Sequence, residues 1–134
     1  MKYKFLEHTA DIMFQAFGKS KKEAFENSAM ALKEVMFSGI KFKSKLKRKI
    51  KVSAKDDVGL LYRFLEQFLY LLDADDFVFE KVKVKISKNK LEADVFGDLR
   101  EGYEFTNDVK AITYNSMFVK EENGKVITQV VIDV

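Results

Sequence analysis

The sequence predicts a single α+β domain over residues 1–134, in which two helices pack on a largely antiparallel β-sheet or sandwich. Segments with apolar residues at helical spacing alternate with segments of period two, and the C-terminal half carries four successive strand-like segments. Strands that follow one another directly pair antiparallel. The second helical segment is apolar around most of its circumference, so a sheet must cover it.

The chain begins with two short extended segments, Tyr3–Phe5 and Asp11–Phe17. A helix is predicted next, over residues 20–38, because small and apolar side chains recur there every three or four positions. Ser20 and Glu23 form a capping-box pattern, in which the serine accepts a hydrogen bond from a free helix amide and the glutamate reaches back. The first turn of the helix is therefore expected at Ser20.

The segment Lys41–Lys55 has a period of two, which predicts a strand. Lysines occupy one parity and mostly apolar residues the other, with Arg48 as an interruption. In one interpretation the lysine side is a solvent-exposed face or a protected sheet edge. In the other it contacts an RNA backbone or an acidic partner through Lys43, Lys45 and Lys47.

A second helix is predicted to begin at Asp56 or Asp57, either of which is placed to cap it. Its wide apolar stripe consists of Leu60, Leu61, Phe64, Leu65, Phe68, Leu69, Leu71 and Leu72. The acidic stretch Asp73–Asp76 ends the helix. This stretch lacks the glycine and the distal glutamate of a calcium-binding EF-hand loop, so we interpret it as a solvated helix end.

The rest of the chain is predicted to be strands joined by loops. The strands are expected at Phe77–Ile86, Leu91–Gly97, Lys110–Val119 and Val126–Asp133. In the first of them, three alternating lysines (Lys81, Lys83 and Lys85) oppose apolar residues. Asp98–Asp108 is expected to be a polar loop, and the third strand to be irregular near Asn115–Ser116. Asn123–Gly124 is a strong signal for a hairpin turn.

The composition favours a cytoplasmic protein that does not associate with membranes. No apolar run approaches the roughly 20 residues that cross a bilayer, and the N-terminal residues lack the apolar core of a secretion signal. The chain has no cysteine and one histidine, which excludes thiolate zinc sites, cysteine nucleophiles and metal centres with several imidazoles. The net charge of +3 is too small to indicate nucleic-acid binding by itself.

Candidate metal ligands occur near both ends of the sequence. His8, the only histidine, precedes Asp11 by three residues, and the sequence closes with Asp133 and Val134. If the first and last strands are neighbours, the carboxylates of Asp11 and Asp133 converge with the terminal carboxylate of Val134. Such an oxygen-rich ligand set suits Mg²⁺, Ca²⁺ or Mn²⁺. The alternatives are that His8 is structural, that Asp11 caps a turn and that Asp133 faces solvent.

Four stretches together resemble the archease family. They are His8–Asp11, Leu60–Leu71, Lys110–Tyr114 and Val130–Val134. The resemblance implies an accessory protein that promotes guanylylation and repeated turnover of the tRNA-splicing ligase, which joins a 3′-phosphate or cyclic phosphate end to a 5′-hydroxyl. It also implies that the partner ligase uses GTP. Some members of the family are described as chaperones of a tRNA cytosine methyltransferase, so an RNA-binding or chaperone module is the alternative function.

The same resemblance assigns roles to individual residues. Asp11, Asp133 and the carboxylate of Val134 correspond to the metal site, Lys110 to a functional lysine, and His8 to a residue that orients Asp11. The sequence departs from the family pattern at Asn115, where a histidine is often found. No obvious nucleophile or general base beyond His8 accompanies the carboxylates, so we do not expect the protein to be an enzyme.

Overall fold

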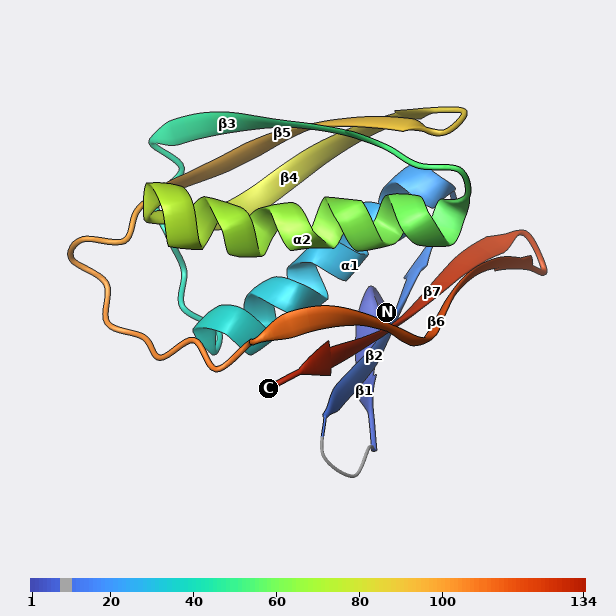
Figure 1. Cartoon of the computed structure of the whole chain (residues 1–134), viewed down its shortest axis with the longest axis horizontal. Coiled ribbons are helices and arrows are strands. Elements are labelled where there is room, and N and C mark those ends of the chain that lie inside the picture. Colours follow the sequence, from blue (N-terminus) through green and yellow to red (C-terminus); the bar gives the residue numbers. More distant parts are fainter. Residues whose placement is uncertain (8–10) are drawn as a thin grey trace.

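Two antiparallel sheets enclose a layer of two helices (Figure 1). The structure, a computed structural model, describes residues 1–7 and 11–134. Sheet A contains, in spatial order, β1 (Tyr3–Leu6), β2 (Ile12–Gly18), β7 (Lys125–Asp133) and β6 (Ala111–Glu122). Sheet B contains β3 (Leu46–Ser53), β5 (Lys90–Leu99) and β4 (Phe77–Ser87). The helices are α1 (Lys21–Phe37) and α2 (Asp57–Asp75). The predicted antiparallel α+β class is confirmed, and the strands are divided between two sheets.

Side-chain caps fix where both helices begin. The Oγ atom of Ser20 accepts from the N–H of Glu23 at 3.2 Å, and the carboxylate of Glu23 accepts from the N–H of Lys19 at 3.1 Å. Asp56, not Asp57, caps α2, since its Oδ1 atom accepts from the N–H of Gly59 at 2.7 Å. These bonds satisfy amides that have no partner within the helix.

The wide apolar stripe of α2 is explained by its position between the sheets. One side of α2 contacts β6 of sheet A, and the other contacts the strands of sheet B. Phe64 and Phe68 are fully buried, and the ring of Phe68 lies 4.3 Å from that of Phe79 on β4. A helix covered on two sides must be apolar over most of its circumference.

The predicted strand over Lys41–Lys55 is wrong for its first five residues, because β3 begins only at Leu46. Side chains bind the backbone that precedes β3. The N–H of Phe42 donates to the Oε1 atom of Glu80 at 2.8 Å, and the N–H of Lys43 donates to the hydroxyl of Tyr103 at 3.1 Å. These contacts replace the ladder hydrogen bonds that a strand would need.

Arg48, which interrupts the apolar parity of β3, is accommodated by an aromatic ring. Its guanidinium carbon lies 4.9 Å from the centroid of the Phe77 ring, and its Nε atom lies 4.0 Å from the Oδ2 atom of Asp75. A guanidinium is well suited to stacking on an aromatic face. The positive charge of Arg48 therefore lies at the end of the helix-facing side of sheet B, and β3 continues through Arg48 without a break.

The loop between β5 and β6 is held by aromatic side chains, although its sequence is mostly polar. The rings of Tyr103 and Phe105 lie 4.8 Å and 6.2 Å from the ring of Phe42. The hydroxyl of Tyr103 donates to the Oδ2 atom of Asp98 at 2.8 Å. This hydrogen bond lowers the pKa of Asp98, with smaller contributions from the N–H of Leu99 and from nearby lysines.

The lowered pKa of Asp98 predicts a pH-dependent contribution to stability. A carboxyl group with a lower pKa in the folded state stabilises the protein above its unfolded pKa, and this contribution is lost as the pH falls through the folded pKa. We expect Tyr103→Phe to lower the melting temperature at neutral pH, and to reduce the further fall on acidification to about pH 3. Thermal unfolding across this range measures both effects. Tyr70→Phe, at an exposed tyrosine, is the control, and identical profiles for the two variants would contradict the prediction.

None of the helices in the described part of the chain combines the length and the apolar character that crossing a membrane requires.

Candidate metal-binding site

The C-terminal strand β7 is the best buried strand of sheet A and positions the candidate site. It lies between β2 and β6, and Val130, Val131 and Ile132 are fully buried. A buried hydrogen bond of 2.7 Å joins the hydroxyls of Ser28 on α1 and Thr128 on β7. Apolar packing and this polar contact fix β7. Asp133, which follows the buried segment, therefore has a defined position.

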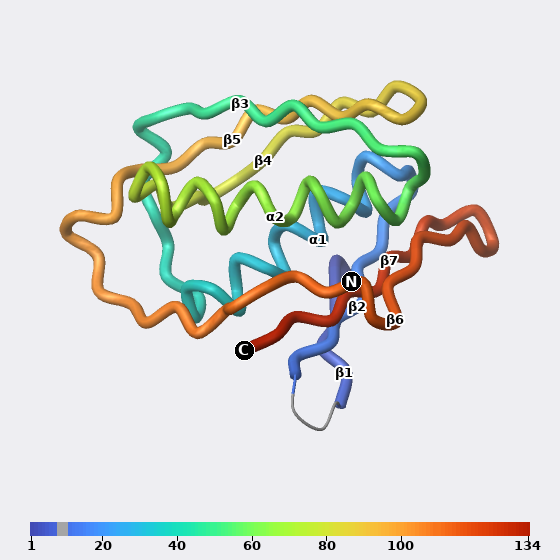
Figure 2. The backbone as a smooth tube through the Cα atoms, in the orientation of Figure 1, coloured from blue at the N-terminus to red at the C-terminus, as the bar shows by residue number. Residues whose placement is uncertain are grey.

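Asp11 and Asp133 lie at the same end of neighbouring strands. The last pair of the β2–β7 ladder is Ile12 with Ile132, and Asp11 directly precedes the first of these residues while Asp133 directly follows the second. On the other side of β7, the N–H of Lys110 donates to the carbonyl oxygen of Asp133 at 2.8 Å. The C-terminal end of β7 thus lies beside the start of β2 and the start of β6 (Figure 2).

The donor chemistry at this end of sheet A fits a hard divalent cation. Asp11 and Asp133 are half-buried, and Lys110 is exposed. Two neighbouring carboxylates attract a cation and supply the oxygen ligands that Ca²⁺, Mg²⁺ and Mn²⁺ prefer. Within residues 1–7 and 11–134, no three His, Cys, Asp or Glu side chains are grouped closely enough to hold an ion by themselves. The predicted site has two such side chains, and its third carboxylate is that of Val134.

A shallow hollow of about 520 Å³ adjoins Asp11. Residues of β1, β2 and the end of α1 line it, and two of them, Glu7 and Glu34, are further carboxylates. We did not predict a role for either residue from the sequence. Glu7 directly precedes the His8–Asp11 stretch, and this position in the sequence could have indicated that its carboxylate lies near Asp11. Glu34 lies on α1 and reaches the hollow only through the packing of that helix against β2.

The remaining predicted site residues are placed differently. His8 lies outside the described residues. Lys43 and Lys45 precede β3, and their charges help to lower the pKa of Asp98. Lys47 lies within β3 and is exposed. The three lysines predicted as one contact row therefore do not share one strand.

The model of the archease protein family (MTH1598/TM1083) matches residues 3–134. The chain belongs to this family. The protein archease of Pyrobaculum neutrophilum is 36% identical and is matched over 98% of this chain and 95% of its own length. The protein archease of Pyrococcus abyssi is 38% identical, over 96% of this chain and 95% of its own length. The resemblance predicted from the four sequence stretches is confirmed.

Solved structures show the same fold. The solution structure of Methanobacterium thermoautotrophicum protein 1598 has a TM-score of 0.85 and 33% sequence identity, and the match covers 98% of each chain. The crystal structure of a Thermotoga maritima protein, described as an archease and "possible chaperone", has a TM-score of 0.71 and 19% identity, over 96% of this chain and 94% of that one. At this identity the Thermotoga structure supports the archease fold alone.

The departure from the family pattern at Asn115 falls in an irregular part of β6. The register between β6 and β7 shifts between Thr113 and Phe118, and Ser116 has a positive φ of 57°. The predicted irregularity near Asn115–Ser116 is thus confirmed. Tyr114, in this part of β6, stacks on Tyr62 of α2 with ring centroids 3.9 Å apart. The region without the histidine is consequently attached to the helix layer by an aromatic pair.

Proposed function

We propose that this archease is a metal-dependent accessory protein that promotes guanylylation and turnover of the tRNA-splicing ligase acting on 3′-phosphate RNA ends. Membership of the archease family supports the class of function. The observation that supports the metal dependence is the ladder register, which ends at the pair Ile12–Ile132 and leaves Asp11 and Asp133 at the same end of neighbouring strands. The backbone N–H of Lys110 also donates to the carbonyl oxygen of Asp133. In this proposal the protein is not itself a catalyst, and it acts while docked on the ligase.

The residues at the site have complementary tasks in this proposal. Asp11 and Asp133 hold the divalent cation, and the exposed ammonium of Lys110 contacts a phosphate of the GTP that the ligase uses. When bound, the cation supplies positive charge that lowers the cost of bringing a triphosphate close to carboxylates. Lys110 lies next to Asp133 through the backbone hydrogen bond described above, and in this proposal its ammonium offsets part of the charge of the carboxylates.

Guanylylation of the purified ligase tests the proposal directly. Labelled GTP is incubated with the ligase alone and with an equimolar amount of this protein, and the label transferred to the ligase is measured over time. Joined RNA per ligase molecule is then measured with substrate in excess. We expect faster labelling and more than one joined product per ligase only when this protein is present. Equal labelling and equal turnover in both samples would refute the proposed activity.

The assigned role of Val134 predicts an effect of tags. The terminal carboxylate of Val134 is an oxygen ligand only where Val134 is the last residue of the protein, because a fused tail converts it into an amide. We expect a short flexible tail after Val134 to remove most of the stimulation of guanylylation, whereas the same tail before Met1 leaves it intact. The assay above measures both fusions. Equal stimulation by the two fusions would remove the Val134 carboxylate from the ligand set.

A further inference from the structure

The outer face of sheet B carries two parallel rows of lysines. One row runs along β3 and the other along β4. The register across β3, β5 and β4 aligns Lys47 with Phe96 and Lys81, Lys49 with Asp94 and Lys83, and Lys51 with Glu92 and Lys85. Directly opposed residues share a face, and in each strand the alternate residues are the buried ones that face the helices. We call the exposed set the lysine face; its lysines are Lys47, Lys49, Lys51, Lys81, Lys83 and Lys85.

The lysine face carries an excess of positive charge. Six lysines and the two central carboxylates give a net charge of +4, whereas the whole chain has +3. The remainder of the molecule is therefore slightly negative. Lysines two residues apart on a strand are separated by about 6.6 Å, and the β3 and β4 rows by about 10 Å, from standard sheet dimensions. The face thus presents positive charge at regular intervals in two lines.

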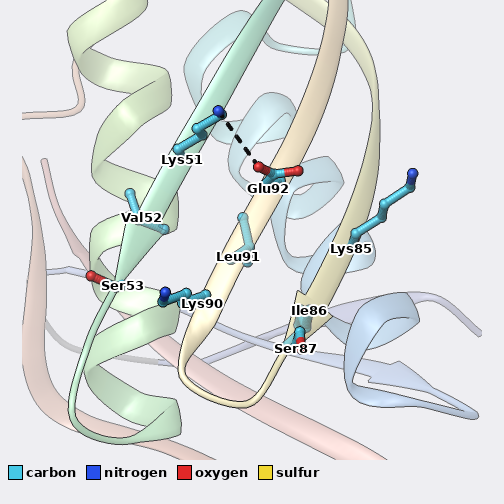
Figure 3. Close-up of a pocket in the computed structure, with 9 residues that line it drawn as sticks. All are labelled: Lys51, Val52, Ser53, Lys85, Ile86, Ser87, Lys90, Leu91 and Glu92. Atoms are coloured by element: carbon cyan, nitrogen blue, oxygen red, sulfur yellow. Dashed lines mark ion pairs between the residues drawn. The ribbon is translucent and has the colours of Figure 1, made fainter.

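The lysines of β3 and the lysines of β4 differ in whether they form ion pairs. On β3, Lys49 lies 3.3 Å from Asp94 and Lys51 lies 3.6 Å from Glu92. Among the described residues, no carboxylate lies within 4.0 Å of the ammonium groups of the β4 row, Lys81, Lys83 and Lys85. Figure 3 shows Lys51 directed at Glu92 and Lys85 directed away from it. The β4 row is therefore available to an external anion.

Protection of a sheet edge does not account for the β4 row. β4 is an edge strand, and edge lysines commonly prevent pairing with another chain. Here a helix already blocks the edge, since the N–H of Val84 donates to the Oε2 atom of Glu26 on α1 at 2.8 Å. The side chains of the β4 lysines also belong to the face of the sheet that is turned away from the helices.

A shallow depression lies at one end of sheet B. It has a volume of about 530 Å³, lies at the β4–β5 hairpin and is lined by residues of all three strands (Figure 3). Its lining contains Lys51, Lys85 and Lys90 and the hydroxyls of Ser53 and Ser87, beside the apolar side chains of Val52, Ile86 and Leu91. Ammonium and hydroxyl groups are donors that recur in contacts with phosphate oxygens.

We propose that the lysine face binds the phosphate backbone of RNA without base selectivity. Regularly spaced point charges match a polyanion of regular repeat, whereas a protein partner would require an apolar centre for the interface. The only aromatic ring among the residues aligned on this face is that of Phe96. It is half-buried and has the ammonium of Lys81 5.3 Å from its centroid, so it offers no free platform for a base. The choice of RNA as the polyanion rests on the proposed function. The existence of the lysine face is independent of that function.

Direct binding by the isolated protein tests this inference. The probe is a fluorescent single-stranded RNA of mixed sequence, and anisotropy is recorded from low to moderate salt. Each phosphate neutralised contributes about −0.7 to the slope of log affinity against log salt. We expect the triple variant Lys81→Glu, Lys83→Glu and Lys85→Glu to weaken binding about tenfold or more and to flatten the slope by about 2. The corresponding Lys→Gln triple keeps the test valid if the reversed charges prevent folding.

The control is a second triple variant that changes the net charge by the same amount, at lysines near sheet A. Lys19→Glu, Lys120→Glu and Lys125→Glu together alter exposed lysines near one end of sheet A, and we expect RNA binding close to that of the parent protein. Equal weakening by both triples, absence of RNA binding, or tighter binding of polyglutamate than of RNA at the same salt would overturn the inference. Asp133→Asn is expected to retain RNA binding, so a failure of the ligase proposal remains distinguishable from a failure of this one.

Discussion

Asp133→Asn and Asp11→Asn are each expected to reduce the stimulation of ligase guanylylation at least about tenfold while the fold is retained. Asparagine keeps the size of the side chain and removes its negative charge, so the cation loses one of only two side-chain carboxylates. Both residues are half-buried at a strand terminus, where a substitution of this kind changes the free energy of unfolding by about 1 kcal/mol or less.

A readout without the ligase separates metal binding from docking. A cation that binds only the folded protein stabilises it by about 2.7 kcal/mol at 100 times its dissociation constant. We expect added Ca²⁺, Mg²⁺ or Mn²⁺ to raise the melting temperature of the parent protein, and neither Asp variant to respond. Glu122→Gln, an exposed carboxylate at the far end of β6, is the matched control and should respond like the parent. Normal stimulation and a normal metal response in both Asp variants would refute the site.

Phe68→Ala is expected to cost about 3–5 kcal/mol of unfolding free energy, the largest effect on stability that we predict. Phe68 is fully buried in the helix layer, with ring centroids of Phe64 and Phe79 at 5.1 Å and 4.3 Å. Truncation leaves a cavity between α2 and sheet B that neighbouring rings cannot fill without moving. Urea unfolding measures the loss as a shift of the midpoint.

The same helix provides the control for this substitution. Tyr70 lies two residues further along α2, and 61% of it is exposed to solvent. Tyr70→Ala is expected to change the unfolding free energy by no more than about 0.5 kcal/mol. A comparable loss in the two variants would contradict the prediction, because burial between the sheets would then not determine the cost.

Local signals in the sequence were sufficient for most of the elements. The cap at Ser20 and the Asn123–Gly124 turn act over a few residues, and the structure confirms both: Ser20 caps α1, and Asn123 and Gly124 have positive φ values of 53° and 76°. The alternation of lysines failed as a signal in the segment before β3. There the backbone amides of Phe42 and Lys43 are bound by Glu80 and by the hydroxyl of Tyr103, which are remote in sequence.

The site residues stay a prediction from family likeness, which singled out Asp11, Asp133 and Lys110. Their places at one end of sheet A depend on β7 pairing with β2 on one side and with β6 on the other, for which the sequence has no local signal. Glu34 joins the same neighbourhood through helix packing, for which the sequence has no local signal. The lysines of β4 were visible as an alternation, and only the position of β5 between β3 and β4 makes them part of one surface.

The sequence by itself determined the fold class, the type of each element and the family, because caps, turns and hydrophobic periodicity are properties of neighbouring residues. Only the tertiary structure decided how the strands divide into two sheets around the helices, and which residues face each other across them. Pairing partners are chosen by the burial of apolar faces over long sequence separations, and a shift of one residue would move every side chain to the opposite face. The places of Asp11 and Asp133 at one end of the β2–β7 pair and the rows of the lysine face both depend on that choice.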